Sequence, residues 1–244
     1  MGILDNTQRK AKLVDPREVI IYSLPKVGKT RLALTCPKNY LLVDFENGAD
    51  YYEGNIININ SYKDLIELFK ELAKTKAHYD VIFLDTLTSL YENLCNQIAV
   101  TMYNKDNNKS EDLNWDITML AYGLGQKYMR AALQKVKETF KKYCKTLVIF
   151  GHAADRAMDG SDGSNLTIQE LAIDGKLKHI IALKTDALGL LYRDEEGVNK
   201  LSFATASGLI GGTRVPHLAN KDFIFSEQDE DGNLTVHWDQ FFTK

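Results

Sequence analysis

One stretch near the start of the chain, residues 17–34, constrains the fold more than any other. It reads REVIIYSLPKVGKTRLAL, so a β-branched apolar run meets a turn ending in Gly-Lys-Thr, and an apolar segment typical of a helix follows. Strand, loop and helix in this order are the context in which G-x-x-x-x-G-K-[ST] forms a phosphate-binding loop. Ser23 replaces the first glycine of that pattern. We therefore predict a nucleotide-binding protein.

The phosphate-loop pattern predicts which residues contact the phosphates and the metal ion. Backbone N–H groups at a helix start would surround the β-phosphate, Lys29 would reach the β and γ oxygens, and the Thr30 hydroxyl would bind Mg²⁺. The predicted cofactors are therefore ATP and Mg²⁺. The predicted nucleotide-binding residues are Ser23, Leu24, Pro25, Lys26, Val27, Gly28, Lys29, Thr30 and Arg31. The alternative is an ordinary strand-to-helix turn in which Gly-Lys-Thr arises by chance.

Composition limits the remaining possibilities. The 244 residues carry a net charge of −3, so no overall basic field indicates nucleic acid, and any DNA contact must come from a local surface. Three cysteines are scattered without a C-x-x-C pair, which argues against zinc or a disulfide framework. No apolar run reaches membrane-spanning length. We expect a soluble protein of the cytoplasm without membrane contact.

Two further buried strands end in acidic residues. Residues 39–46 (NYLLVDFE) precede an Asn-Gly turn, and residues 81–84 deliver Asp85 to the end of the next strand. A strand-end Asp downstream of a phosphate loop is the Walker B arrangement, which orders Mg²⁺. Glu46 is our candidate for the base that activates the attacking water, with Asp44 ranked second. The alternative for Glu46 is a residue that caps the turn.

The rest of the chain alternates helices and strands and ends in hairpins. We predict helices over 61–72, 87–103, 115–143 (interrupted near Gly123 and Gly125) and 176–183, a strand over 145–152 ending in His152, a strand or helix start over 166–173, and polar connections over 104–114 and 153–165. Hairpins are predicted for 186–192 with 198–204 and for 223–226 with 234–238. This order predicts an α/β fold: a mainly parallel sheet flanked by helices and extended by C-terminal antiparallel hairpins. We divide the chain into a polar tail (1–17), an ATPase domain (18–218) and a β-rich segment packed on the core (219–244).

The ordered motifs SLPKVGKT, LLVDFENG, VIFLDTLTSL and LVIFGH resemble the RecA-like P-loop ATPase core. More narrowly, the chain resembles phage-encoded RecA-related ATP-binding proteins of the single-strand annealing group. The resemblance covers residues 18–218 and includes GLIGGTRVPHL, which is similar to a closing G-x-R-x-P-x-L segment.

The resemblance implies a Mg-dependent ATPase coupled to single-stranded DNA binding or annealing in phage recombination or replication, in the host cytoplasm. Glu46 matches the glutamate that activates water, Asp85 the Walker B acid, and His152 a γ-phosphate sensor. Residues 153–170 lie where such proteins carry a disordered DNA-binding loop, with Arg156, Lys176 and Lys178 as its nearby cations. A homo-oligomer is implied, with a single-strand-binding protein as a further partner.

Several alternatives stay open. His152 fits a buried structural histidine equally well, residues 153–170 fit a surface connection, and Arg214 fits either an arginine finger or a structural ion pair. Ser23 suggests slow hydrolysis, and only about seventeen residues precede the first strand, which argues against filament formation. The alternative functions are a non-catalytic ATP-dependent scaffold or loader and a P-loop small-molecule kinase.

Overall fold

A computed structural model describes residues 11, 13–159, 165–173, 175–204, 211–229 and 231–243. The strands are β1 (Glu18–Ser23), β2 (Tyr40–Asp44), β3 (Ile56–Asn58), β4 (Tyr79–Asp85), β5 (Cys144–Asp159), β6 (Asn165–Leu171), β7 (Ala187–Arg193), β8 (Asn199–Ser202), β9 (Gly212–Thr213), β10 (Asp222–Gln228) and β11 (Leu234–Val236). The helices are α1 (Lys29–Leu34), α2 (Tyr62–Thr75), α3 (Leu87–Ser89), α4 (Cys95–Asn107), α5 (Leu124–Phe140), α6 (Gly175–Lys184) and α7 (Trp238–Phe241).

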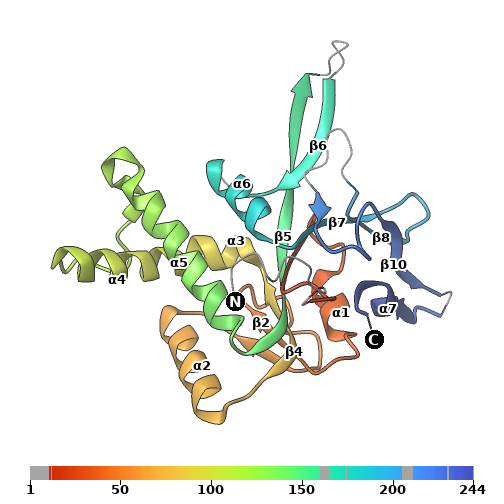
Figure 1. Ribbon diagram of the computed structural model, residues 1–244, viewed down its shortest axis with the longest axis horizontal. Coiled ribbons are helices and arrows are strands. Elements are labelled where there is room, and N and C mark those ends of the chain that lie inside the picture. The colour runs from red at the N-terminus through yellow and green to blue at the C-terminus, as the bar shows by residue number, and fades with distance from the viewer. Residues whose placement is uncertain are drawn as a thin grey trace, which may run out of the picture.

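One large sheet organises the molecule (Figure 1), with the strand order β11-β10-β8-β7-β1-β5-β4-β2-β3. From β7 to β3 all neighbours are parallel, whereas β8, β10 and β11 are antiparallel to their neighbours. Both predicted C-terminal hairpins and the mainly parallel sheet are therefore confirmed. Because β5 lies between β1 and β4, the ends of these three strands meet at one edge of the sheet.

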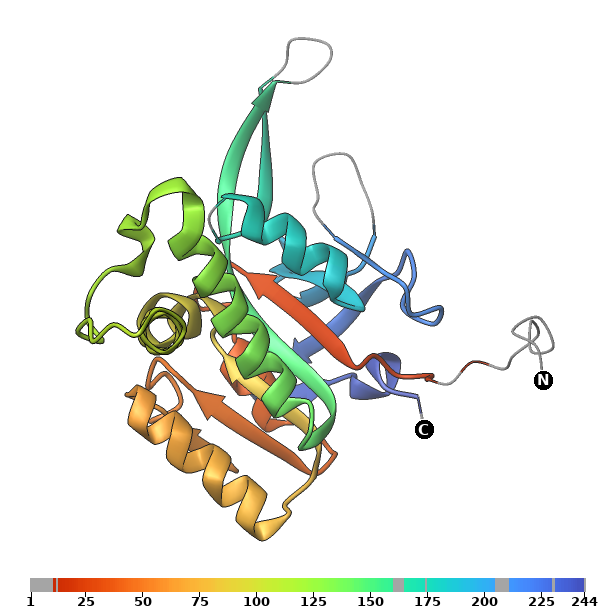
Figure 2. The same ribbon diagram turned by 60° about the vertical axis from the view of Figure 1, so that its left-hand side comes forward.

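The sheet separates two hydrophobic cores. Alternate residues of a strand point to opposite faces, so Ile20 and Tyr22 of β1 enter one core while Val19 and Ile21 enter the other. Residues of α2, α4, α5 and α6 complete the first core, and residues of α1 and α7 complete the second (Figure 2). Because both faces are covered, the central strands are nearly continuous apolar runs.

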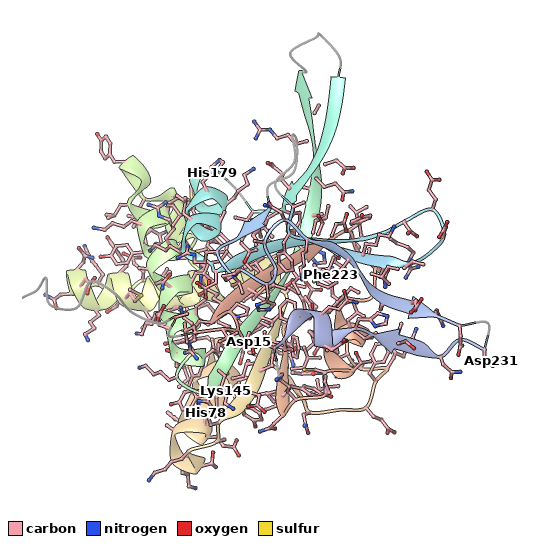
Figure 3. All side chains as sticks on the ribbon, turned by 45° about the vertical axis from the view of Figure 1, so that its right-hand side comes forward. Asp15, His78, Lys145, His179, Phe223 and Asp231 are labelled. Carbon is pink, nitrogen blue, oxygen red and sulfur yellow. The ribbon has the colours of Figure 1, made fainter. Side chains whose placement is uncertain are left out.

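Segments near the two ends of the described chain pack together beside the second core. Trp238 lies edge-on to Phe83, with ring centroids 5.8 Å apart. Asp15, labelled in Figure 3, accepts hydrogen bonds of 2.8 Å from both the backbone N–H and the hydroxyl of Thr243. Residues near both ends of the described chain are thus part of the same packed body.

The amphipathic helix predicted for residues 61–72 is α2, and its start follows a capping rule. The backbone N–H of Asp64 donates to Ser61 Oγ at 3.2 Å, and Asp64 Oδ2 accepts from the N–H of Asn60 at 3.1 Å. The first bond satisfies a backbone donor that the first helical turn leaves unpaired, and the second pairs the N–H of the residue before the cap. Ser61 is therefore the N-cap of α2.

Two predicted boundaries in the middle of the chain are wrong. The helix predicted over 87–103 is divided by a π-helical turn, Leu90–Leu94, and then continues through the start of the predicted 104–114 connection to Asn107. The helix predicted from Trp115 begins only at Leu124, after two short 3₁₀ turns. The backbone explains the late start, since Tyr122 (φ 57°) and Gly123 (φ 69°) are both left-handed and interrupt the right-handed helix just before Leu124.

The largest correction concerns residues 153–165, predicted as a polar connection without structure of its own. Strand β5 continues through them to Asp159 and pairs antiparallel with β6, from Ala153 opposite Leu171 to Asp159 opposite Asn165. The two strands form a ribbon that projects from the body (Figures 1 and 2). Ladder hydrogen bonds order this ribbon, and its β5 half, AADRAMD (residues 153–159), has no regular alternation of apolar and polar residues that could have revealed a strand. Residues 160–164 lie outside the described part.

The second strand of the ribbon and the helix after it agree with the predictions for these residues. Residues 166–173, predicted as a strand or a helix start, contain most of β6, and the helix predicted over 176–183 is α6. Within the described part of the chain, no helix combines the length and the apolar character that a membrane crossing needs.

Candidate functional site

The site lies where the parallel strands end. The register of the sheet pairs Ser23 of β1 with His152 of β5, and Asp44 of β2 with Asp85 of β4. In open parallel sheets, ligands bind outside the carboxyl ends of the strands. The sheet therefore brings together the predicted phosphate loop, Walker B acid, base and sensor.

The phosphate loop joins β1 to α1 through a residue that must be glycine for conformational reasons. Gly28 has φ 106°, in the left-handed region, although an added Cβ there would meet nothing within 4 Å. Lys29 follows as the first residue of α1 and is only 6% exposed. Its Nζ donates to Ser23 Oγ at 2.9 Å and to the Leu24 carbonyl at 3.5 Å. The serine that replaces the expected glycine thus supplies a partner for the lysine ammonium.

Lys29 and its acidic neighbours influence one another's ionisation. Burial lowers the pKa of Lys29, while the charges of Asp85 and Glu46 partly offset this effect. Burial raises the pKa of Asp85 to about 6, against the opposing effects of the Thr30 hydrogen bond and the Lys29 charge. A buried cation and a buried acid at the end of this loop fit a site that receives a charged ligand.

Thr30 and Asp85 fit the magnesium site predicted for them. Thr30 Oγ1 donates to Asp85 Oδ2 at 2.6 Å, so a hydroxyl and a carboxylate, both oxygen ligands of the kind Mg²⁺ prefers, lie side by side. No group of three or more His, Cys, Asp or Glu residues that could hold a metal occurs in the described part of the chain. A Mg²⁺ ion held by Thr30 and Asp85 would take its other ligands from nucleotide phosphates and water, as this ion commonly does.

Glu46 lies just beyond the end of β2, where three side chains contact one of its oxygens. Oε1 accepts from Thr86 Oγ1 at 2.5 Å and from Ser89 Oγ at 2.6 Å, and it lies 3.2 Å from His152 Nε2. The hydrogen bonds from His152, Ser89 and Thr86, in that order of size, lower the pKa of Glu46 to about 2 despite partial burial. Glu46 is therefore a carboxylate at neutral pH, and His152 is its direct neighbour.

Asp44, the second candidate base, has a different role. It is 1% exposed, and its two oxygens accept from the backbone N–H groups of Glu46 and Ala49, each at 2.8 Å. Both oxygens are thus committed to the turn that follows β2. Asp44 caps this turn and fixes the backbone of Glu46, so Glu46 is the acid that remains available for chemistry.

Sequence reasoning missed Thr86 and Ser89. Both lie in the DTLTS segment directly after the Walker B strand, and Thr86 caps α3 by accepting from the Ser89 N–H at 3.5 Å. A Thr at a strand-to-helix boundary is a recognisable cap signal. Thr86 and Ser89 lie 40 and 43 positions from Glu46 in the sequence, so their contact with it can be recognised only once the order of the strands is known.

A cavity of about 240 Å³ adjoins the phosphate loop on the side of the C-terminal strands. Its lining includes Gly28, Arg31, Tyr52, Arg193, Asn199 and Gln228. The Arg31 guanidinium donates to the Gly232 carbonyl at 3.4 Å, so the turn between β10 and β11 also reaches the first turn of α1. Apart from Arg31 and Gly28, sequence reasoning did not single out these residues, because the antiparallel strands reach the loop only through the fold.

The basic residues assigned to DNA contact are largely paired. Arg156 lies 3.5 Å from Glu170, and Lys178 contacts the same carboxylate. The side chain of Lys176 lies outside the described part. Arg214 donates to the carbonyls of Leu183 at 2.8 Å and Thr185 at 3.1 Å, which is the contact pattern of a structural residue.

Comparison with known proteins identifies the family. Residues 15–215 match the AAA domain, which covers the phosphate loop, Glu46, Asp85, His152 and most of the sheet. A comparison with curated proteins gives no significant match. Since the match covers most of the chain, the protein belongs to the AAA domain family and contains an AAA-type P-loop ATPase domain.

Proposed function

We propose that the protein binds Mg-ATP at residues 23–31 and hydrolyses it with Glu46 as the general base, in the manner of RecA-like ATPases. The observation that carries this proposal is the position of Glu46. Its carboxylate is ionised and shares one sheet edge with Lys29, Thr30 and Asp85. A base for phosphoryl transfer to water must lie at this edge, beside the residues that hold the phosphates.

Each residue has a defined part in the proposed reaction. Lys29 and the loop N–H groups neutralise the β and γ oxygens, and Thr30 and Asp85 hold Mg²⁺, which supplies further charge neutralisation when bound. Glu46 takes a proton from the attacking water, and the bond between the γ-phosphorus and the bridging oxygen breaks with its electron pair on ADP. His152 contacts the same carboxylate and serves as the sensor that responds to the presence of the γ-phosphate.

The nucleoside part of ATP fits the cavity beside the loop. The cavity combines one aromatic ring, Tyr52, with two side-chain amides, Asn199 and Gln228. An aromatic surface with a few polar groups is typical of sites that bind small planar ligands. The cation of Arg193 is anchored in this wall, since its Nε donates to Asn199 Oδ1 at 3.2 Å.

Turnover of the Glu46→Gln variant tests the proposal. We expect a loss of about 10²- to 10⁴-fold in kcat without a change in Mg-ATP affinity, because the substitution removes a base and leaves the phosphate site intact. Glu53→Gln is the matched control, since Glu53 is an exposed glutamate seven positions further along the same connection. Hydrolysis by Glu46→Gln at the wild-type rate would exclude Glu46 as the base.

We further propose that ATP state is coupled to single-stranded DNA, in annealing during phage recombination or replication. The link is His152, which contacts Glu46 and directly precedes the projecting part of β5. The ribbon sequence, residues 153–171, holds four carboxylates (Asp155, Asp159, Asp162 and Glu170) and a single cation, Arg156. Phosphate contact therefore needs an additional basic surface.

The outer face of α5 supplies such a surface. Lys127 and Lys135 are exposed there, and Tyr122, fully exposed, lies just before the helix. Fluorescence anisotropy with an oligo-dT strand should show tighter binding with ATP and a steep loss with salt. Arg156→Ala and Lys127→Glu should each weaken binding without changing ATP affinity, whereas Lys63→Glu, at an exposed lysine of α2, is the charge control. If both variants bind oligo-dT with wild-type affinity at several salt concentrations, these residues do not form the DNA-binding surface.

A homo-oligomer, and contact with a single-strand-binding protein, are also proposed. Light scattering with and without ATP tests the first, and co-sedimentation with a purified single-strand-binding protein tests the second.

A non-catalytic scaffold or loader is the second candidate, and one observation favours it. A carboxylate whose pKa is lowered to about 2 is a weak base, so turnover without an activator would be slow. ATP turnover measured with and without single-stranded DNA separates the candidates. Stimulation by DNA supports the ATPase, and binding without any turnover supports the scaffold.

A further inference from the structure

We propose that the hydroxyl groups of Thr86 and Ser89 are the positioning groups of the reaction: they hold Glu46 by one oxygen so that its other oxygen faces the attacking water. This inference rests on the proposed role of Glu46 as the base, and it assigns a function to two residues that the phosphate-loop and Walker B motifs do not include.

The hydrogen-bond pattern gives each hydroxyl a defined direction. Thr86 Oγ1 accepts from the Ser89 N–H at 3.5 Å, so its own hydrogen is left to donate to Glu46 Oε1 at 2.5 Å. Ser89 Oγ donates to the same oxygen at 2.6 Å. Thr86 and Ser89 are the cap and the last residue of α3, and Thr86 is buried, so both donors are fixed to the end of the Walker B strand.

Glu46 needs such an anchor. It lies outside β2 with its side chain 31% exposed, and a glutamate in that position has three freely rotating side-chain bonds. Its backbone is fixed by Asp44, which leaves the direction of the carboxylate undetermined. The three contacts to Oε1, from Thr86, Ser89 and His152, determine this direction.

The two carboxylate oxygens of Glu46 differ in their hydrogen bonding, and this difference carries the inference. All three donors converge on Oε1, whereas Oε2 accepts no hydrogen bond within the described part of the chain. A general base must keep a lone pair free toward the proton that it takes, at hydrogen-bonding distance from the water. Oε2 meets this requirement while Oε1 acts as the anchor.

In the proposed step, one proton moves from the water to Glu46. The water oxygen forms a bond to the γ-phosphorus, its proton moves to Oε2 of Glu46, and the bond to the bridging oxygen breaks with its electron pair on ADP. A base displaced by about 1 Å loses on the order of 10²-fold in rate, so small rotations of an unanchored carboxylate would be costly.

Steady-state kinetics on hydroxyl-deletion variants test the proposal. We expect Ser89→Ala and Thr86→Val each to lower kcat about tenfold, which is the effect of losing one hydrogen bond to a charged group. The KM for ATP and the affinity for a non-hydrolysable analogue should change less than about twofold. Ser89→Thr and Thr86→Ser, which keep the hydroxyl, should restore most of the rate.

Thr88→Val is the matched control. Thr88 lies between the two residues, and its hydroxyl oxygen is buried without a hydrogen-bond partner among the described residues. Its replacement should leave kcat unchanged. This control separates a loss of positioning from a general disturbance of α3, and Ser89→Ala, at a partly exposed position, keeps the test valid if Thr86→Val fails to fold.

Three results would overturn the inference. Wild-type kcat in both Ser89→Ala and Thr86→Val, with Glu46→Gln inactive, would refute positioning while leaving Glu46 as the base. A higher kcat in Ser89→Ala would mean that the hydroxyls restrain the base. Wild-type hydrolysis by Glu46→Gln would refute the proposed function and this inference together. In a Glu46→Gln background, adding Ser89→Ala should cause no further loss, because the group to be positioned is gone.

Discussion

Replacing Lys29 by methionine tests the phosphate site most directly. The substitution removes the ammonium but keeps an unbranched apolar stem of similar length in a position that is 6% exposed. Only the charge and its hydrogen bonds to Ser23 and the Leu24 carbonyl are lost. The packing of α1 against the second core should therefore survive.

The expected loss of affinity follows from the bonds that this ammonium would make. A hydrogen bond to a charged group contributes about 1.5–3 kcal/mol, and one bond each to a β and a γ oxygen gives about 3–6 kcal/mol. That corresponds to roughly 10²- to 10⁴-fold in Kd. The free energy of unfolding without nucleotide should stay within about 1 kcal/mol of wild type. Burial lowers the pKa of Lys29, which means that keeping this charge costs the folded state free energy. The substitution removes this cost and also removes the hydrogen bond to Ser23, so the two effects oppose each other.

Calorimetric titration with a non-hydrolysable Mg-ATP analogue measures this loss, and urea unfolding checks the fold. Lys63→Met is the control, because Lys63 is an exposed lysine of α2 and lies outside the proposed binding residues. Its loss should change Kd only about threefold, the effect of one solvated charge at a distance. Equal affinity in Lys29→Met and wild type would refute the assignment of the loop, and equal losses in both variants would show a general charge effect.

Three further outcomes are expected. Gly28→Ala should destabilise the protein by about 1–3 kcal/mol in thermal unfolding, because φ is 106° there, and should also weaken ATP binding. Glu18→Ala should cost about 3–5 kcal/mol in urea unfolding, since it leaves the buried ammonium of Lys137 unpaired, whereas Glu138→Ala, at a surface ion pair, should cost less than about 1 kcal/mol. The low pKa of Glu46 adds stability that is complete above its ordinary value of 4.5 and is lost as pH falls toward 2. The free energy of unfolding of wild type should therefore exceed that of Glu46→Gln by about 1 kcal/mol at pH 7, after allowance for solvent screening, and by less at pH 3.

The site residues that could be predicted are those whose role follows from their immediate neighbours in the sequence. Lys29, Thr30 and Asp85 each follow an apolar strand, and a polar residue after such a strand lies at the edge where ligands bind. Glu46 could be ranked above Asp44 only as a preference, because both follow the same strand. The structure separates them by hydrogen bonding: Asp44 has both oxygens committed to backbone N–H groups, and Glu46 does not.

The parts that could not be predicted depend on contacts between distant segments. Thr86 and Ser89 reach Glu46 across the sheet, and the cavity wall at Asn199 and Gln228 comes from strands near the C-terminus. The ribbon escaped prediction for a different reason. Backbone pairing with β6 orders residues 153–159, whose sequence AADRAMD has no regular alternation, whereas the alternation in β6 did allow a strand to be considered there.

In the proposed function, β5 would join the nucleotide site to the projecting ribbon. Between β1 and β4 it is a buried strand, and past His152 the same strand becomes one half of the projecting ribbon. His152 thus stands at the transition, with its ring against Glu46 and its backbone opposite Ser23. A ligand that shifts the ribbon would act on the strand that carries His152, and a change at the γ-phosphate would act on the same residue from the other side. Because coupling between two sites is reciprocal, DNA that alters turnover through this strand must also be bound differently in the ATP and ADP states.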